Sequence, residues 1–535
     1  MIKKVLLIEP PVTRPVDFDA KKVRIGIVPP LGLAYLAAVL EKNDFEVRIL
    51  DCLIEGSLGG IPYTKKRIRY GLTDEEIKRE ITSFSPDLVG VSCLFSAKVY
   101  DMLNICKITK EIDSRLVTIT GGAHPTTAFS EVLKDKNLDF VVIGEGEYTL
   151  LDLIRVLNEK KDISNVDGLA YKENNKVHVN PKTKYIENLD DLPLPARHLL
   201  KMDKYINTSS PHSGIKRRPF TSMVTSRGCP FRCSFCVIRK LWGTKARFRS
   251  AENVLLEIEE LVNKYGIKEI HFEDDNLTAE KERAKAIFGG IIKKGWDLTL
   301  NSPSGLAVHK LDEELLNIMK KAGYYSISIA IESGDEDILK LMHKPVNLEK
   351  VKQLVTTARM LGLKTKGFFI LGYPGENKEQ MQRTVNFAAN VGLDWAIFFI
   401  ATPIPGSDLD KVCREKGYLI DENLDYMKQF YISNIKTPDF EPEYVEKLRE
   451  QANFEINFKN NINLLAGRYN RAIEDLSEVV KLYPHLDFAH FYLGVAYEKK
   501  GLKNKALQEF KTVLELNQDY EEAKEKLERI RNVSK

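Results

Sequence analysis

Three cysteines within eight residues constrain this chain more than any other feature. They lie in Cys229-Pro-Phe-Arg-Cys233-Ser-Phe-Cys236, directly after a strand-like run over 220–226. Three thiolates can hold three irons of a [4Fe–4S] cluster, whose usual full ligation is four cysteines, and the fourth iron is then free to bind a ligand. The alternative is a structural zinc site, but zinc takes four closed ligands, usually as two short pairs, and the sequence has no second such pair. The spacing therefore favours an iron–sulfur cluster.

Length, charge and cysteine usage narrow the class of protein. The chain has 535 residues, which predicts about three or four domains. Its net charge is only +4, so charge alone does not indicate a nucleic-acid partner. The apolar run at the N-terminus is too short for a signal peptide, and no run of about 18 apolar residues predicts a transmembrane segment. Seven cysteines, three of them in one loop, suit a metal site in a reducing cytoplasm better than a disulfide framework.

Residues 1–150 alternate strand-like apolar runs with helical patterns. This alternation predicts an α/β domain with a doubly wound, Rossmann-like parallel sheet. Ligands of such sheets bind beyond the C-terminal ends of the strands, where glycine lets a large ligand approach the backbone. Glycine-rich and polar turns follow several of these runs. The predicted strands cover residues 5–8, 47–50, 88–92, 117–120 and 141–143.

The residues of these turns resemble the cobalamin-binding domain of cobalamin-dependent radical S-adenosylmethionine (radical SAM) enzymes. The similar motifs are Pro-Pro-Leu-Gly-Leu-Ala-Tyr from residue 29, Pro-Asp-Leu-Val-Gly-Val-Ser from 86, Gly-Gly-Ala-His-Pro-Thr from 121 and Gly-Glu-Gly-Glu from 144. The resemblance implies that cobalamin is bound here. By that resemblance, the cobalamin-contacting residues would be Ser92, Gly121, Gly122, His124, Gly144 and Glu145.

One departure from the wider cobalamin-binding pattern concerns the cobalt ligand. The Asp-x-His-x-x-Gly motif, whose histidine ligates cobalt, is absent after the first predicted strand, where residues 9–14 contain no histidine. We therefore expect cobalt to be bound base-off without a protein histidine. His124 is the alternative ligand, although a histidine in such a loop more often hydrogen-bonds the backbone or a polar edge of the ligand.

Residues 220–407 contain six strand-then-helix units, which predict a partial (βα)6 barrel. Barrel active sites lie at the C-terminal strand ends. Each predicted strand ends in polar or glycine-containing turns. A single turn of this kind is explained by local turn or helix-cap preferences, but six around one cysteine loop indicate a site. The predicted strands are near 220–226, 267–273, 297–301, 325–332, 366–371 and 396–401.

The spacing C-x3-C-x2-C and the strand-end motifs resemble radical SAM enzymes. The resemblance implies that Cys229, Cys233 and Cys236 hold the cluster and that S-adenosylmethionine (SAM) binds beside it. Glu273 and Asp274 would hold the amino group of SAM. Arg247 and Arg249 would either offset cofactor charge or lie on the surface. The remaining SAM residues would be Asn301 and Glu332 at the ribose or carboxylate, Ser333 beside them, and Phe235 along the adenine.

The other segments carry weaker signals. Residues 151–219 are expected to form a linker with a small hairpin, and residues 408–455 a helical connector that could cover the active site. Within 456–535, small and apolar residues recur after 34 positions, as in Gly467 and Gly501, and this period resembles the tetratricopeptide repeat. Only about two repeats fit, while about three are needed for stability, so we expect the tail to pack on the enzyme or on a partner. An ordinary amphipathic helical tail is the alternative.

These features together predict a cytoplasmic, cobalamin-dependent radical SAM enzyme. The family resemblance implies a 5′-deoxyadenosyl radical and, most commonly, methylation of an unactivated carbon. A ring-forming or oxidising enzyme, such as the oxygen-independent cyclases of tetrapyrrole synthesis, is the alternative. A cobalamin-binding sensor or scaffold fits less well, because it would not need the three cysteines. We expect a small-molecule or lipid-like substrate, an external electron donor such as flavodoxin or ferredoxin, and a possible protein partner of the tail.

Overall fold

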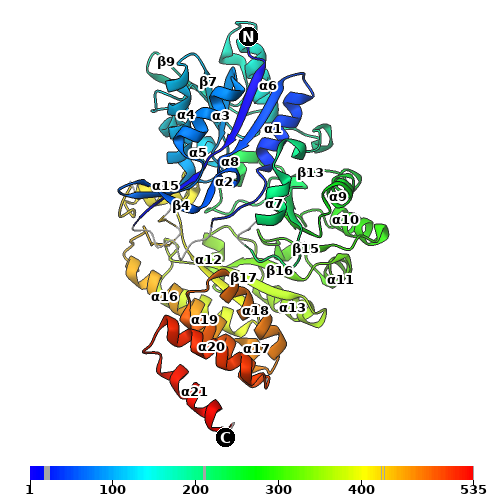
Figure 1. Cartoon of the computed structure of the whole chain (residues 1–535), viewed down its shortest axis with the longest axis vertical. Helices are drawn as coiled ribbons and strands as arrows, with labels where there is room; N and C mark the ends of the chain where they lie inside the picture. Colours follow the sequence, from blue (N-terminus) through cyan, green and yellow to red (C-terminus); the bar gives the residue numbers. More distant parts are fainter. Residues whose placement is uncertain (17–24, 209–212, 423, 427, 430, 534–535) are drawn as a thin grey trace.

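The computed structural model describes residues 1–16, 25–208, 213–422, 424–426, 428–429 and 431–533. Three parts follow one another along the long axis of the molecule: an N-terminal sheet with helices, a central barrel and a group of C-terminal helices (Figure 1). The predicted α/β class is confirmed. Among the described residues, no helix combines the length and apolar character needed to cross a lipid bilayer.

The N-terminal sheet has the strand order β10-β9-β8-β7-β6-β1-β3. The five neighbouring strands β8, β7, β6, β1 and β3 run parallel to one another and lie close to the five predicted positions, so the doubly wound sheet is confirmed. The predicted hairpin, β9 and β10, pairs antiparallel with β8 and therefore extends this sheet. The strands are β1 (Lys4–Glu9), β3 (Glu46–Asp51), β6 (Leu88–Ser92), β7 (Val117–Gly121), β8 (Phe140–Val142), β9 (Leu169–Glu173) and β10 (Lys176–Asn180).

Helices cover both faces of this sheet, which explains why its strands are apolar almost throughout. Leu33 of α1 and Leu150 of α6 belong to one buried cluster, whereas Ile77 of α3 and Met102 of α4 belong to another. Helix α6 continues across residue 150, where the linker was predicted to start. The bounds are α1 (Leu31–Glu41), α2 (Cys52–Glu55), α3 (Asp74–Phe84), α4 (Val99–Ile112), α5 (Ala123–Val132), α6 (Glu147–Asn158) and α7 (Met202–Thr208).

A small antiparallel sheet, which the sequence did not predict, follows the C-terminal ends of β1 and β3. It consists of β2 (Val12–Pro15), β5 (Arg67–Gly71) and β4 (Ser57–Thr64). The side chain of Arg69 in β5 is fully buried; its Nε donates to Thr13 Oγ1 at 3.1 Å, and its guanidinium pairs with the carboxylates of Asp74 and Asp101. This ion network ties the small sheet to helices α3 and α4.

The central part is the predicted six-stranded partial barrel. Its strands are parallel and lie in chain order, as two hydrogen-bonded triplets that single bridges join at Leu300–Tyr324 and Leu306–Ile329. The strands are β11 (Phe220–Met223), β14 (Glu269–Phe272), β15 (Thr299–Asn301), β16 (Ser326–Glu332), β17 (Lys364–Leu371) and β18 (Trp395–Ile400). The helices are α9 (Ala251–Tyr265), α10 (Lys281–Lys294), α11 (Glu313–Ala322), α12 (Glu336–Leu341), α13 (Leu348–Met360) and α14 (Lys378–Asn390).

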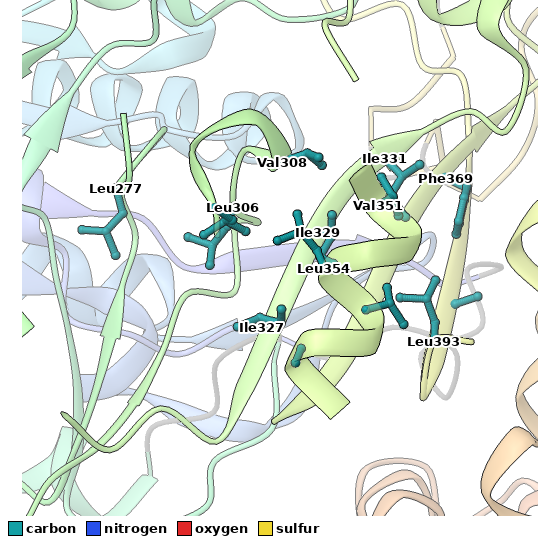
Figure 2. Packing of buried hydrophobic residues seen from close by; sticks show 14 of the residues in the cluster. Leu277, Leu306, Val308, Ile327, Ile329, Ile331, Val351, Leu354, Phe369 and Leu393 are labelled. Carbon is teal, nitrogen blue, oxygen red and sulfur yellow. The ribbon is translucent and has the colours of Figure 1, made fainter. Parts of the chain in front are cut away.

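The barrel core follows from the two-residue alternation of its strands. Ile327, Ile329 and Ile331 lie on one face of β16 and pack with Val351 and Leu354 of α13 (Figure 2). The alternate residues of β16, beginning with Ser326 and Ser328, point to the other face, which is the interior of the barrel. The apolar core therefore lies between strands and helices, and the interior is left for polar residues.

Two asparagine side chains close the free edge of β18. An edge strand presents unpaired backbone groups. Here Ala396 N donates to Asn457 Oδ1 at 2.8 Å, and Asn457 Nδ2 donates to Ala396 O at 2.6 Å. Asn453 forms the same pair of bonds with Phe398, each 3.2 Å long. Asn453 lies in α16 (Pro442–Phe454) of the connector that begins with α15 (Asp408–Glu415), and Asn457 lies in the π-helix η6 (Glu455–Lys459), where the tail begins. The connector and the start of the tail therefore complete the barrel edge together.

The predicted helical C-terminal tail is confirmed. Helices α20 (Lys503–Leu516) and α21 (Glu521–Val533) begin and end 34 residues after α18 (Tyr469–Leu482) and α19 (Asp487–Lys499), and the short α17 (Ile462–Leu465) precedes them. Helix α18 packs on the barrel at the N-terminal ends of β17 and β18, which we call the barrel floor. Lys364 Nζ lies 2.7 Å from Asp475 Oδ1 there, and Arg471 Nη2 lies 3.1 Å from Asp394 Oδ2. The assignment to the tetratricopeptide repeat stays a prediction.

Candidate functional site at the facing strand ends

The cysteine loop connects the short strand β12 (Ser226–Arg227) to helix α8 (Ile238–Trp242). Gly228 starts the loop with φ +83°, and a Cβ at this position would lie 2.7 Å from Lys245 O, so the turn requires glycine. The backbone of Ser234 donates to Met342 O at 3.0 Å and accepts from Leu409 N at 2.9 Å. These bonds hold the loop between the segments that follow β16 and β18.

The three cysteines are available as ligands. Cys229 and Cys233 are half-buried, Cys236 is exposed, and all three thiols are free. Within the described ranges, no three His, Cys, Asp or Glu side chains converge as they would around one metal ion. A [4Fe–4S] cluster bonds each thiolate to a different iron, so its ligands surround a volume rather than a point. Asn276 Nδ2 lies 3.7 Å from Cys229 Sγ and donates to it.

Two side chains after β14 keep acceptor atoms without a partner. Glu273 Oε2 accepts from Ser304 Oγ at 3.2 Å, but Glu273 Oε1 and Asn276 Oδ1 are buried with no hydrogen-bond partner among the described residues. Burial raises the pKa of Glu273. An unpaired buried acceptor is costly, so it marks a place where a ligand's donor would be stabilised. Asn276 was not predicted, and its only signal was its place in the same turn as Glu273.

Glu332 lies at the end of β16 in a conformation that non-glycine residues rarely adopt. Its φ is +71°, next to an irregularity in the pairing of β16 with β17, and such backbone strain is concentrated at functional sites. Lys344 Nζ lies 2.9 Å from Glu332 Oε1. Burial raises the pKa of the Cys233 thiol, and the Lys344 ammonium acts in the opposite direction. Lys344 therefore lies beside both the cysteine loop and Glu332, although the sequence did not single it out.

Three further predicted SAM residues, Asp274, Asn301 and Ser333, also have side-chain atoms that bond other parts of the protein. Asp274 fastens β14 to the segment before the cysteine loop, although its second oxygen, Oδ2, has no partner among the described residues. These partners favour structural roles for Asn301 and Ser333, and SAM contacts of all three stay predictions. Phe235 packs partly buried against the barrel core. The bonds are Thr225 Oγ1 to Asp274 Oδ1 (2.7 Å), Ser302 N to Asn301 Oδ1 (2.9 Å), Asn301 Nδ2 to Tyr325 Oη (3.3 Å) and Ser333 Oγ to Thr384 Oγ1 (3.0 Å).

Four predicted cobalamin residues lie together at the C-terminal ends of β6 and β7. Ser92 and Gly121 are paired in register, and Gly122, with φ +117°, precedes α5. His124 is buried, and its Nδ1 lies 2.8 Å from Ser96 Oγ. Its Nε2 has no partner among the described residues. Burial lowers the pKa of His124 to about 4, so the imidazole is neutral near pH 7 and can interact through Nε2.

The loop after β6 exposes two large apolar side chains that sequence reasoning did not select. Leu94 is 53% exposed and Phe95 is 60% exposed. Exposed apolar residues at the ligand-binding edge of a doubly wound sheet indicate a contact surface. The signal in the sequence was an apolar pair directly after a strand, which alone does not distinguish a turn from a binding surface.

Gly144 and Glu145 lie at the end of β8 and face the barrel. Gly144 has φ +71°, and a Cβ there would lie 2.9 Å from Leu241 O of α8. Both carboxylate oxygens of Glu145 accept from arginines beside the cysteine loop: Oε1 from Arg227 at 2.9 Å and Oε2 from Arg247 at 2.7 Å. Arg247 is therefore buried at a boundary between two parts of the chain and not on the surface, and so is Arg249.

The binding ends of the N-terminal sheet and the barrel face each other. Helix α5 lies beside α8 of the cysteine-loop segment (Figure 1). A Cβ at Gly406, which follows β18, would lie 2.9 Å from Thr127 Cβ of α5. Tyr426 of the connector packs edge-on against His124, with ring centroids 5.2 Å apart. The two sets of strand ends and the connector therefore form one composite site.

Comparison with known proteins agrees with this geometry. A family model described as the radical SAM superfamily matches residues 223–388, and one described as a B12 binding domain matches residues 22–154. Cytidylyl-2-hydroxyethylphosphonate methyltransferase of Streptomyces wedmorensis is 35% identical over 465 residues, which cover 80% of this chain and 86% of that protein. An uncharacterised methyltransferase of Pyrococcus horikoshii is 34% identical over 453 residues, which cover 84% of this chain and 92% of that protein.

A solved structure shares the whole architecture. The cobalamin-dependent SAM radical enzyme OxsB, solved with aqua-cobalamin and SAM bound, superposes with a TM-score of 0.69 at 16% identity, over 100% of this chain and 81% of that one. The fold and the site thus define a radical SAM protein with a cobalamin-binding domain. This chain belongs to the cobalamin-dependent radical SAM enzymes, and the predicted cofactors of that family, a [4Fe–4S] cluster, SAM and cobalamin, are confirmed.

Proposed function

We propose that this chain methylates an unactivated carbon of a small-molecule substrate. The observation that carries the proposal is the composite site, in which the barrel end that carries the free thiols of the cysteine loop faces the cobalamin-binding strand ends. Two relatives that match most of their length are named methyltransferases. One of them is named for a cytidylyl phosphonate, and a substrate with an anionic group is therefore the first class to assay.

The side chains of the barrel would bind the cluster and SAM. Cys229, Cys233 and Cys236 hold the cluster, and Glu273 Oε1 and Asn276 Oδ1 accept hydrogen bonds from the methionyl amino group of SAM. When bound, the cluster with SAM supplies a radical that removes hydrogen from carbon, and cobalamin supplies the methyl group. Lys344, held by Glu332, brings a positive charge to the carboxylate of SAM.

The N-terminal strand ends would bind cobalamin. Ser92, Gly121 and Gly122 allow the corrin to approach the backbone, and Leu94 and Phe95 offer it an apolar surface. His124 Nε2 bonds a polar group at the edge of the ligand, since Ser96 fixes the ring through Nδ1. Cobalt would be bound base-off, without a protein histidine as its ligand.

Product analysis tests the proposal. With SAM, a reductant and candidate substrates under anaerobic conditions, a methyltransferase forms 5′-deoxyadenosine and S-adenosylhomocysteine in about equal amounts, since one SAM supplies the radical and another the methyl group. Formation of 5′-deoxyadenosine with little S-adenosylhomocysteine would favour the ring-forming or oxidising alternative. Mass spectrometry of the product then distinguishes methylation from ring closure.

Spectra of the cob(II)alamin form test the base-off state. No nitrogen superhyperfine splitting is expected in the electron paramagnetic resonance spectrum. A splitting that disappears in His124→Ala would instead make His124 the axial ligand.

The partners follow from the same chemistry. Reduction of the cluster requires an external electron donor such as flavodoxin or ferredoxin. Leu502 and Leu516 of the tail are partly exposed, and the tail beyond α18 is the part of the chain that could take a protein partner. A cytoplasmic location remains a prediction.

A further inference from the structure

A buried four-charge cluster joins the cobalamin-binding part to the cysteine loop. Arg227 donates to Glu145 at 2.9 Å and to Glu147 at 2.6 Å, and Arg247 donates to Glu145 at 2.7 Å. All four side chains are buried. Burial alone would raise the pKa of Glu147, but the Arg227 guanidinium holds it below its usual value. The cluster therefore consists of two cations and two anions without net charge.

The pairing of β12 with β13 (Arg227/Arg247) explains why a carboxylate is required. Strand β12 and strand β13 (Arg247–Phe248) are antiparallel, and Arg227 lies directly opposite Arg247. Like charges at opposed positions of two strands destabilise the pair. Glu145 bonds one arginine through each oxygen, so the hairpin that flanks the cysteine loop depends on a residue of the N-terminal part.

A second contact comes from the Pro-Pro-Leu-Gly-Leu-Ala-Tyr motif. The Arg227 guanidinium carbon lies 5.4 Å from the ring centroid of Tyr35 and 5.1 Å from that of Trp242. Arg249, two residues after Arg247, donates to Tyr35 Oη at 3.2 Å. Two motifs that the sequence assigned to cobalamin binding thus contact the arginines around the cysteine loop, where cation–π attraction adds to the ion pairs.

We propose that Tyr35, Glu145 and Glu147 are positioning residues, which set the place of the cysteine loop relative to the cobalamin-binding strand ends. Arg227 is followed by Gly228, whose backbone is constrained, and then by Cys229. The position of Arg227 in the four-charge cluster therefore largely determines the position of Cys229, the first ligand of the iron–sulfur cluster. In group transfer, reacting atoms must come within about 3–3.5 Å, and a displacement of about 1 Å can reduce the rate about 100-fold. The four-charge cluster supplies that precision across the boundary between the cobalamin-binding part and the barrel.

The chain offers a matched control for this proposal. Asp394 is also a buried carboxylate with a partner on each oxygen: Oδ1 accepts from Asn463 Nδ2 at 3.0 Å, and Oδ2 lies 3.1 Å from Arg471 Nη2. It lies directly before β18 at the barrel floor and bonds neither the cysteine-loop hairpin nor the Gly-Glu-Gly-Glu turn. Glu145→Gln and Asp394→Asn therefore each remove a buried carboxylate that is paired with arginine, but only the first acts on the boundary next to the cysteines.

The experiment compares both variants as full-length protein with both cofactors bound. Both should lose thermal stability, and both should keep iron and cobalamin. Only Glu145→Gln should change the magnetic interaction between cob(II)alamin and the reduced cluster, measured by pulsed electron paramagnetic resonance. Only this variant should form about 10-fold or more excess 5′-deoxyadenosine over methylated product, because a misplaced methyl donor leaves radical formation intact.

Two outcomes would overturn the proposal. An unchanged magnetic interaction in Glu145→Gln would mean that the cluster of charges is only structural. Loss of cobalamin with retained iron would mean that Glu145 binds cobalamin. If Glu145→Gln does not fold, Glu147→Gln and Tyr35→Phe carry the same two measurements, because each removes a single contact. The product ratio rests on the proposed methyl transfer, but the magnetic interaction does not, so failure of the proposed function and failure of the positioning role give different results.

Discussion

Buried ion pairs join both ends of the barrel to another part of the chain, but the two ends differ in whether their carboxylate and amide oxygens have partners. At the cofactor end, Glu273 Oε1 and Asn276 Oδ1 are buried without partners among the described residues, and Glu332 has a strained positive φ. At the floor, Lys364 and Asp394 are each paired with helix α18. Unpaired carboxylate and amide oxygens and backbone strain thus coincide with the end that binds ligands, whereas the carboxylates of Asp394 and Asp475 at the floor are paired.

The largest difference should appear when the cysteines are changed. Replacing Cys229, Cys233 and Cys236 together with Ala should abolish the cluster and all cleavage of SAM, because no other thiol lies in the loop. Iron and sulfide content, visible absorbance and 5′-deoxyadenosine formation measure this. Cys413→Ala, which changes a buried cysteine of α15, should keep about four irons. A cluster that survives in the triple variant would contradict the assignment.

A substitution at the barrel floor should lower the stability of the fold and leave the cleavage of SAM unchanged. Lys364→Met leaves Asp475 buried without its partner and should reduce the free energy of unfolding by about 3–5 kcal/mol. Denaturant unfolding measures the loss. Combining it with Asp475→Leu should recover much of the stability, since neither charge is then left unpaired. Folded Lys364→Met protein should cleave SAM at the wild-type rate, and loss of cleavage would show that the floor takes part in the site.

Two histidines should show opposite pH dependence of stability. The folded-state pKa of His124 is lowered to about 4 by burial, so its contribution is present above about pH 6.5 and is lost as the pH falls towards 4, by on the order of 2–3 kcal/mol. The hydrogen bond to Glu509 raises the pKa of His490 in the tail. Its contribution is present below about pH 6.5 and is lost as the pH rises.

Unfolding of cofactor-free wild-type protein, His124→Phe and His490→Phe across this pH range measures both effects. The stability difference between wild type and His124→Phe should shrink on acidification, and that for His490→Phe should grow. The same sign for both variants would contradict the assignment of a neutral His124.

The smallest effect should come from the barrel edge. Asn457→Ala removes both hydrogen bonds to Ala396 and should reduce the free energy of unfolding by about 1–3 kcal/mol. Asn386→Ala on the exposed face of α14 is the control and should change stability by less than about 0.5 kcal/mol. Equal effects of the two variants would mean that β18 does not depend on the side-chain amides.

Much of the fold was predictable because its signals are local. The N-terminal parallel strands are apolar almost throughout, and barrel strands such as β16 alternate apolar with polar residues, so all five N-terminal strands and all six barrel strands were found near their places. The sheet formed by β2, β5 and β4 was missed because Arg67-Ile-Arg-Tyr-Gly71 has no continuous apolar run, and the burial of Arg69 depends on Asp74 and Asp101. The asparagines that close β18 were missed because a helix carries them.

The sequence by itself determined the class of enzyme and its cofactors, because ligand spacing within one loop and the motifs at strand ends are properties of short segments. Only the tertiary structure decided where the side chains of those motifs point. Glu145 meets Arg227 and Arg247 across 82 and 102 residues of chain, and Asp475 meets Lys364 through a helix that follows the barrel. Charge pairing of this kind depends on distance in space and on burial, which no local pattern contains.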